Sequence, residues 1–181
     1  MTATTSREGA RRRALPAICL MLGLAFRSAC GIGANPRGVP LTQTFHSPEA
    51  AATAVVNALA AMDLDALRAL PLSEHEFRTV VWPELPSSRP EVNLPVEYAW
   101  GTLNQNSLAS LSSTFGAEAG RVYTVVRVDF KGETTRYSTF AVHREAHVVV
   151  RGADGTEQRV ALFGSLLDRD GQYKIFSYVT D

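Results

Sequence analysis

The sequence predicts an α+β domain in which three or four helices come first and a bent four-stranded antiparallel sheet follows. One observation is a hydrophobic period of three to four residues between residues 47 and 111, which is typical of helices with one buried face. A second is the change to a period of two from Arg121 onward, which is typical of strands. A third is a pair of Asp-Gly dipeptides, at Asp154 and Asp170, each between strand-like runs and favouring a hairpin turn.

The first three helices are predicted from their caps. Ser47, followed by Pro and Glu, is a typical start for the first helix. Asp63 can cap a second, short helix that ends before Pro71, and Ser73 forms with Glu76 the capping box of a third. The apolar residues expected to face inward are Ala51, Val55, Leu59, Met62, Leu64, Leu67, Leu70, Phe77, Val80 and Val81.

A proline-rich stretch separates these helices from a fourth. Residues 83–95 hold four Pro in 13 positions, so we expect an ordered or extended loop there. The fourth helix is predicted from Tyr98 to Leu111, where apolar residues return at helical spacing. Gly116 and Gly120 are expected to close the helical half.

The strands are predicted from alternation and from turns. The expected inward face of the first strand consists of Val122, Thr124, Val126, Val128 and Phe130. A turn at 131–133 leads into a long run over 134–151, for which we expect a bulge or bend near Arg144 and Glu145. Further strands are predicted at 157–167 and 172–180, and sequential hairpins make an antiparallel meander.

This order of elements resembles the nuclear transport factor 2-like architecture, also described as cystatin-like, which polyketide cyclases, steroid isomerases and many small binding domains share. The resemblance covers about residues 45–180 and implies a cone-shaped fold with a pocket between sheet and helices. Because the fold hosts both enzymes and non-enzymes, it implies nothing about the contents of that pocket. The stretch from Phe77 to Pro86 also resembles a segment of uncharacterised small exported bacterial proteins.

The N-terminal residues 1–30 have the layout of an export signal. A basic stretch ending at Arg13 precedes an apolar run over residues 14–26, and small residues follow. The run is shorter than the roughly 20 apolar residues that span a bilayer. Ser28, Ala29 and Cys30 resemble the end of a bacterial lipoprotein signal, which implies lipidation of Cys30 and attachment to a membrane.

Two points qualify this N-terminal prediction. Arg27 departs from the lipoprotein pattern, so ordinary cleavage after Gly31 and free secretion to the periplasm or the extracellular medium stay open. Residues 31–44, rich in Gly and Pro, are predicted to be a flexible tether to a single domain at 45–181. Cys19 and Cys30 both precede that domain, which excludes a disulfide, a thiolate metal site or a cysteine nucleophile within it.

The net charge of zero joins two unlike segments. Residues 1–30 contain five Arg and one Glu, whereas the other 151 residues contain 13 basic and 17 acidic side chains. The predicted mature domain is therefore acidic, which argues against nucleic acid as a partner because phosphates require a surplus of Lys and Arg.

Candidate chemistry is sparse. His143, Glu145 and His147 share one side of a regular strand, but the two His would lie roughly 13 Å apart, too far for one metal ion. We therefore predict no metal site and expect this trio on a solvated face, opposite a core face on which Arg144 is the charged exception. Asp129 is expected to point outward, and His143 would face inward only if a bulge reversed the register. We assign no catalytic residue and no cofactor.

Three aromatic residues offer a binding site instead. Trp82, Tyr98 and Trp100 flank the proline-rich loop and could line a ligand pocket, with Arg78 or Glu97 as polar groups. The alternative is that these rings only hold the loop against the helices.

The function expected from the sequence is a non-catalytic, exported and lipid-anchored binding module of the cell envelope. Its partners would be the membrane, through the N-terminal anchor, and an unknown small ligand or envelope protein. The alternative is a cofactor-free lyase or isomerase of the polyketide-cyclase-like type, with an acid or base in the cone cavity.

Overall fold

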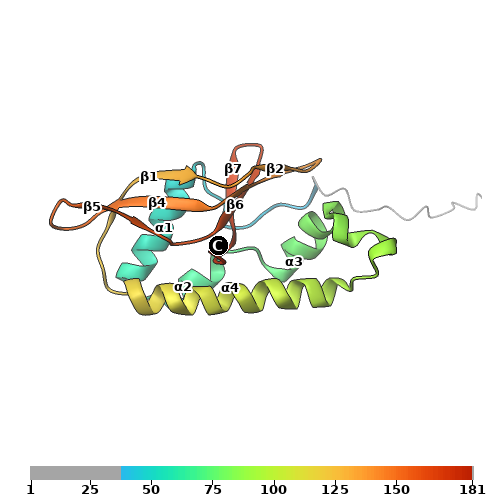
Figure 1. The fold of residues 1–181 in the computed structure, drawn as a ribbon, viewed down its shortest axis with the longest axis horizontal. Helices are drawn as coiled ribbons and strands as arrows, with labels where there is room; N and C mark the ends of the chain where they lie inside the picture. The colour runs from blue at the N-terminus through green and yellow to red at the C-terminus, as the bar shows by residue number, and fades with distance from the viewer. Residues whose placement is uncertain (1–37, 181) are drawn as a thin grey trace, which may run out of the picture. The chain divides into compact units, whose positions relative to one another are not determined.

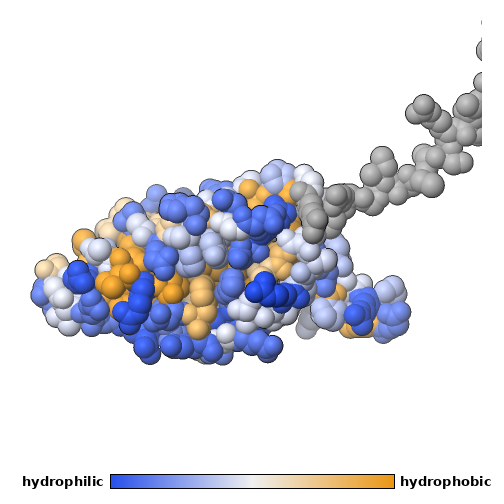
Figure 2. Space-filling view, turned by 90° about the horizontal axis from the view of Figure 1, so that it is seen from above, coloured by the Kyte–Doolittle hydropathy of each residue, from blue (hydrophilic) through white to orange (hydrophobic). Residues whose placement is uncertain are grey.

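The computed structural model describes residues 38–180, which belong to one compact unit. The architecture is α+β: helices come first, and antiparallel strands in two sheets follow. Figure 1 shows α4 along one side of this unit and the strands along the other, with α1 and α2 between them. Figure 2 shows the unit from above as a space-filling view, in which hydrophilic and hydrophobic residues both reach the surface. No helix within residues 38–180 combines the length and the apolar character that crossing a membrane requires. The predicted signal peptide, Cys30 and the first part of the tether lie outside the described residues.

The first three helices begin at the predicted caps. In α1 (Pro48–Ala60), the Ser47 hydroxyl accepts a hydrogen bond from the amide of Ala50. In α2 (Leu64–Ala69), the Asp63 carboxylate caps the amide of Ala66. The short α3 (Glu74–Glu76) starts with a complete capping box and continues as the π-helical turn η2 (Phe77–Val81). Local hydrogen bonding therefore explains where each of these helices starts.

The proline-rich stretch is ordered, and the fourth helix is longer than predicted. Three 3₁₀ turns, η3 (Trp82–Glu84), η4 (Pro86–Ser88) and η5 (Pro90–Val92), carry the chain to α4 (Val96–Glu118). Gly116 lies inside α4, whereas Gly120 has a φ of +77° and ends the helix, donating its amide to the carbonyl of Leu59. The positive φ explains why Gly120 and not Gly116 terminates α4.

The strands form two sheets, and the chain passes repeatedly from one sheet to the other. One sheet has the order β1 (Thr124–Phe130), β4 (Ala146–Arg151), β5 (Glu157–Val160). The other has the order β2 (Thr135–Arg136), β3 (Ala141–Arg144), β6 (Ser165–Arg169), β7 (Gln172–Ser177). All pairs are antiparallel. The predicted turn at 131–133 is wrong: pairing with the next segment continues through Lys131 and Gly132, and the chain reverses between β2 and β3, where the amide of Tyr137 donates to the carbonyl of Phe140.

The bend expected near Arg144 and Glu145 is confirmed. Strand β3 passes into β4 through Glu145 alone, and that residue has a φ of +53°. A non-glycine residue in this left-handed region redirects the chain sharply. The same run therefore begins in one sheet and ends in the other.

The predicted inward face of the first strand is wrong over its first half. Val125 pairs with Val150 while Arg127 pairs with Val149, so Val126 is the extra residue of a β-bulge. The bulge reverses the faces, and Val122 is 69% exposed. The side chains of this region that pack against the core are Tyr123, Val125, Val128 and Phe130.

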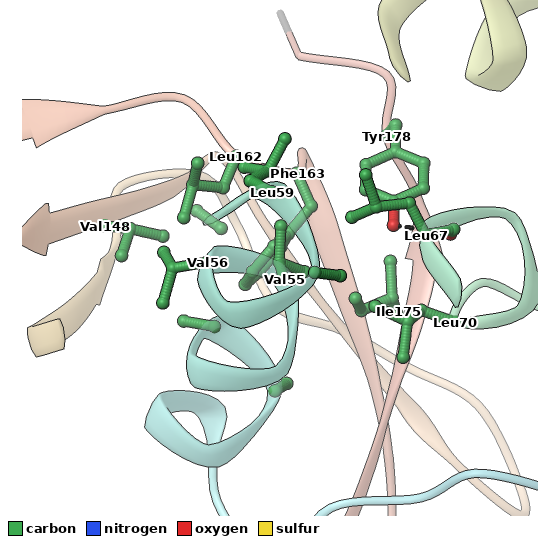
Figure 3. Close-up of a cluster of buried hydrophobic side chains, with 14 of the residues drawn as sticks. Val55, Val56, Leu59, Leu67, Leu70, Val148, Leu162, Phe163, Ile175 and Tyr178 are labelled. Atoms are coloured by element: carbon green, nitrogen blue, oxygen red, sulfur yellow. Dashed lines mark hydrogen bonds between the residues drawn. The ribbon is translucent and has the colours of Figure 1, made fainter. Parts of the chain in front are cut away.

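Two hydrophobic clusters hold the layers together. Figure 3 shows the first, in which Val55 and Leu59 of α1 lie near Phe163 and Leu162, and Leu67 of α2 lies near Tyr178. The second cluster consists of Leu72, Phe77, Val80, Val81, Phe140, Val142 and Leu167. Because Leu166 belongs to the first cluster and Leu167 to the second, both faces of the β2-β3-β6-β7 sheet are packed.

The end of the predicted tether contacts the domain. Val39 and Leu41 pack against the second cluster, and Phe45 exchanges two backbone hydrogen bonds with Tyr173 in β7. Thr42 donates both its amide and its hydroxyl to the carboxylate of Glu76. Residues 38–44 are thus part of the folded unit.

Candidate ligand-binding site

Helix α4 covers the sheet only loosely. Of its 23 residues, only Ser107 and Leu111 are buried. Trp100 and Leu103 pack against the second cluster, and the Ser107 hydroxyl accepts a hydrogen bond of 3.0 Å from the amide of Tyr178. Space therefore remains between this helix and the strands beside it.

That space includes a cavity of about 230 Å³, which we call the α4 groove. Its walls come from α4, β3, the start of β6, and the end of β7 with the segment after it. Its lining residues are Leu103, Asn106, Val142, Arg144, Gly164, Ser165, Phe176, Ser177 and Val179. Most of the wall is apolar, and the polar side chains converge at one end of β3 and β6, as ligand pockets typically arrange them.

One further hollow shares a lining residue with the α4 groove, and a second hollow shares lining residues with the first. One, of about 330 Å³, shares Gly164 with the groove and includes Glu145 and His147. It in turn shares Ala161 and Thr180 with a hollow beside the last turns of α4. A Cβ added to Gly164 would lie 1.5 Å from the carbonyl oxygen of Val179, so the two backbones are in contact where the hollows meet.

Arg144 is the charged residue of the α4 groove. It is the exception on the predicted core face of its strand, and the structure brings it to the cavity wall. Among residues 38–180, no acidic side chain lies within salt-bridge distance of its guanidinium. By contrast, Arg78 and Arg151 each contact a carboxylate at 2.7 Å. The sequence signal for this site was a cation at a strand position predicted to face the core; in the structure Arg144 is exposed at the edge of the groove.

His143 is not on a solvated face, contrary to the prediction. Its side chain is 21% exposed and lies between the rings of Phe130 and Tyr173, at centroid distances of 5.0 and 6.3 Å. Its Nδ1 is 3.0 Å from the Thr134 hydroxyl, and its Nε2 is 3.6 Å from Asp168 Oδ2. The reason is that both faces of this sheet carry packed side chains, and Phe130 and Tyr173 cover the face of β3 on which His143 lies.

Tyr173 belongs to the group of side chains around His143, which we call the histidine cluster and which consists of Phe130, Thr134, His143, Asp168 and Tyr173. Burial raises the pKa of its phenol, and the negative charges of Asp168 and Glu49 raise it further. The phenol therefore stays protonated at neutral pH. His143 lines none of the three hollows beside α4, so the cluster and the groove are separate features.

The other residues of the predicted trio do not join His143. His147 lies opposite Asp129 in β1, and the bend at the exposed Glu145 separates it from His143. Within residues 38–180, no group of three His, Cys, Asp or Glu side chains could hold a metal ion.

The three predicted aromatic residues are only partly brought together. Trp82 and Trp100 both contact Phe77, with ring centroids 6.0 and 5.5 Å apart, whereas Tyr98 is 66% exposed. The cavity that Trp100 lines measures about 30 Å³, the volume of about one water molecule in the liquid. Arg78 contacts Glu97 at 2.8 Å. A ligand-binding role for the three rings stays a prediction.

Compared with known proteins, the chain matches no family model, no curated protein and no solved structure.

Proposed function

We propose that this chain is an exported, lipid-anchored protein of the cell envelope whose domain binds a small ligand in the α4 groove without transforming it. The proposed anchor is Cys30, at the end of the basic, apolar and small segments that typify an export signal. The proposed fold class is nuclear transport factor 2-like. Its support is the order of helices before a bent antiparallel meander and the place of the groove between a helix and that sheet.

One observation carries the binding role: the α4 groove is a cavity of about 230 Å³ whose only ionisable lining residue is Arg144. A guanidinium stays protonated in proteins, so it can bind an anion but cannot exchange protons near neutral pH. General acid or base catalysis needs a group that does exchange them. The lining of the groove therefore favours binding over catalysis.

The second candidate function is the cofactor-free lyase or isomerase. The approach of His143 to Asp168 favours it, because a carboxylate beside an imidazole is a common acid–base arrangement. In this case a substrate would have to reach an imidazole that lies between Phe130 and Tyr173. The groove offers an open cavity without such a rearrangement.

The proposal is tested by ligand-observed NMR with water-soluble fragments of about eight to twelve non-hydrogen atoms and the full chain in detergent, with empty detergent as the blank. The variant Asn106→Trp places an indole in the groove, and Gln105→Trp places one on an exposed α4 position outside its lining. We expect fragments that bind the wild type to be lost with Asn106→Trp and kept with Gln105→Trp. A wild type that binds no fragment, or an Asn106→Trp variant that binds all of them, would contradict the proposal.

A further inference from the structure

We infer that the α4 groove selects short apolar carboxylates, with Arg144 binding the carboxylate and the apolar wall holding the rest of the ligand. This inference rests on the proposed binding function and adds the chemical class of the ligand. It follows from the order in which the lining residues lie along the sheet.

The register of β3 and β6 gives the groove one apolar end and one polar end. Val142 and Arg144 are two residues apart in β3, so they share a face of the strand. Their partners in β6 are Leu167 and Ser165, respectively, and therefore lie on that same face. Leu167 belongs to the second hydrophobic cluster, whereas Ser165 lines the groove. The Val142 end of the groove is therefore lined by packed apolar side chains, and the Arg144 end has a guanidinium beside the Ser165 hydroxyl.

Helix α4 follows the same order on the opposite wall, where Leu103 provides apolar contact. Phe176 and Val179, from β7 and the segment after it, add apolar contact near the Ser165 end of the groove. Asn106, one turn further along α4, adds an amide that can donate hydrogen bonds. An elongated ligand with one anionic end matches this arrangement because each part of it meets groups of its own kind.

The backbone and Cβ of Arg144 are contacted by Gly132. The amide of Gly132 donates to the carbonyl of Arg144, and a Cβ at Gly132 would lie only 2.9 Å from the Arg144 Cβ. The segment between β1 and β2 therefore packs directly against the Cβ of Arg144. The free part of the side chain is the guanidinium, whose two-pronged donor geometry fits a carboxylate.

Charge and volume narrow the ligand class. One guanidinium balances one negative charge, whereas a phosphate monoester carries roughly −1.5 to −2 at pH 7. The groove of about 230 Å³ lies below the ~300 Å³ at which drug-sized pockets begin. A monocarboxylate of about eight non-hydrogen atoms, such as hexanoate, is the size this volume accommodates. Hexanamide has the same shape without the charge.

The experiment compares hexanoate with hexanamide by isothermal titration calorimetry on the full chain in detergent at pH 7. We expect the wild type to bind hexanoate at least tenfold more tightly than hexanamide. Arg144→Gln removes this preference while still binding hexanamide, and Arg144→Lys keeps part of it because the positive charge remains. The control Arg159→Gln removes the same charge from an exposed position in β5 and keeps the full preference.

The outcomes separate the two claims. Equal binding of both probes by the wild type, or a tenfold preference that survives in Arg144→Gln, overturns the carboxylate inference and leaves the binding function standing. Binding of neither probe by the wild type, together with no fragment binding, overturns the proposed function itself. A thermal melt of Arg144→Gln that matches the wild type shows that the lost preference is not a loss of folding.

Discussion

The ammonium of Lys174 lies 3.7 Å from the carboxylate oxygen Oε2 of Glu76, and their side chains are only 1% and 2% exposed. Lys174 also donates to the carbonyl of Thr42 at 2.7 Å, and Thr42 donates back to Glu76. Ser73 adds two more hydrogen bonds to the same carboxylate. This buried network joins β7, α3 and the segment that leads into α1, so it fixes where the chain enters the domain.

Breaking this pair on one side is expected to be costly. Glu76→Gln leaves the Lys174 ammonium buried without a counter-charge. Lys174→Met likewise leaves the Glu76 carboxylate buried without a counter-charge. Removal of one partner of a buried pair typically lowers the free energy of unfolding by about 3–5 kcal/mol. The double variant should lose less than the sum of the single losses, because neither charge is then stranded. Urea denaturation of the four proteins measures this, and strictly additive losses would argue against the coupling.

An exposed ion pair provides the control for that cycle. Arg68 and Asp65 lie 3.5 Å apart with side chains 56% and 95% exposed. Arg68→Gln should leave the denaturation midpoint unchanged, because exposed pairs contribute little.

Acid should weaken the domain through two carboxylates. Burial alone would raise the pKa of Glu76, but hydrogen bonds from Ser73 and Thr42 and the charge of Lys174 outweigh burial and hold it below 4.5. Burial likewise acts to raise the pKa of Glu84, and hydrogen bonds from Thr139 and Ser138 outweigh it. Their contribution to stability is therefore present above pH 4.5 and is lost as the pH falls through the lower folded-state pKa values.

The measurement is the melting temperature as a function of pH. We expect it to decline below about pH 4.5, because the unfolded state then binds more protons than the folded state. Glu76→Gln should flatten part of that decline. An unchanged slope in this variant would show that Glu76 does not contribute.

Local signals in the sequence were sufficient to predict the starts of the first three helices, but they could not predict features that depend on a pairing partner. Ser47 and the capping box at Ser73 act within one turn, and both are where the sequence placed them. The bulge at Val126 depends on the register with β4, so alternation alone could not reveal it. The burial of His143 depends on packing against both faces of its sheet.

The candidate site was predicted only in part. Arg144 was visible as a cation on a predicted core face, but the cavity beside it is formed by α4, β3, β6 and β7 together, which no local pattern encodes. Trp82 and Trp100 were expected at a ligand pocket; both pack on Phe77, Trp100 also lines a cavity of about 30 Å³, and their role in binding stays a prediction. Their spacing in the sequence predicted that the two rings lie close together, but it could not predict which residues they contact.

Gly164 is predicted to be intolerant of any side chain. In Gly164→Ala the new Cβ would lie 1.5 Å from the oxygen and 2.6 Å from the carbon of the Val179 carbonyl, so backbone must move. Overpacking of this kind costs about 1–3 kcal/mol or more. Gly101→Ala is the control, because a Cβ at that position in α4 meets nothing within 4 Å and alanine favours helix by roughly 0.5–1 kcal/mol. Thermal melts that fail to rank Gly164→Ala below Gly101→Ala would contradict the contact.

The proposed membrane anchor predicts a modified Cys30. Intact-mass measurement of the membrane fraction should find a chain that begins at Cys30 and carries added acyl mass. Cys30→Ser should move the protein to the soluble fraction, because the thiol that receives the lipid is absent. An unmodified Cys30 on a full-length soluble chain would exclude both export and lipidation.

Binding of a ligand between α4 and the sheet can be observed by methyl NMR of the full chain during a hexanoate titration. We expect the shifts to concentrate on the methyls of Leu103, Val142 and Val179, with intermolecular nuclear Overhauser effects to the ligand. Shifts concentrated around Ala141 near the separate hollow that Asp168 and Asp170 line, or no shifts at all, would contradict it.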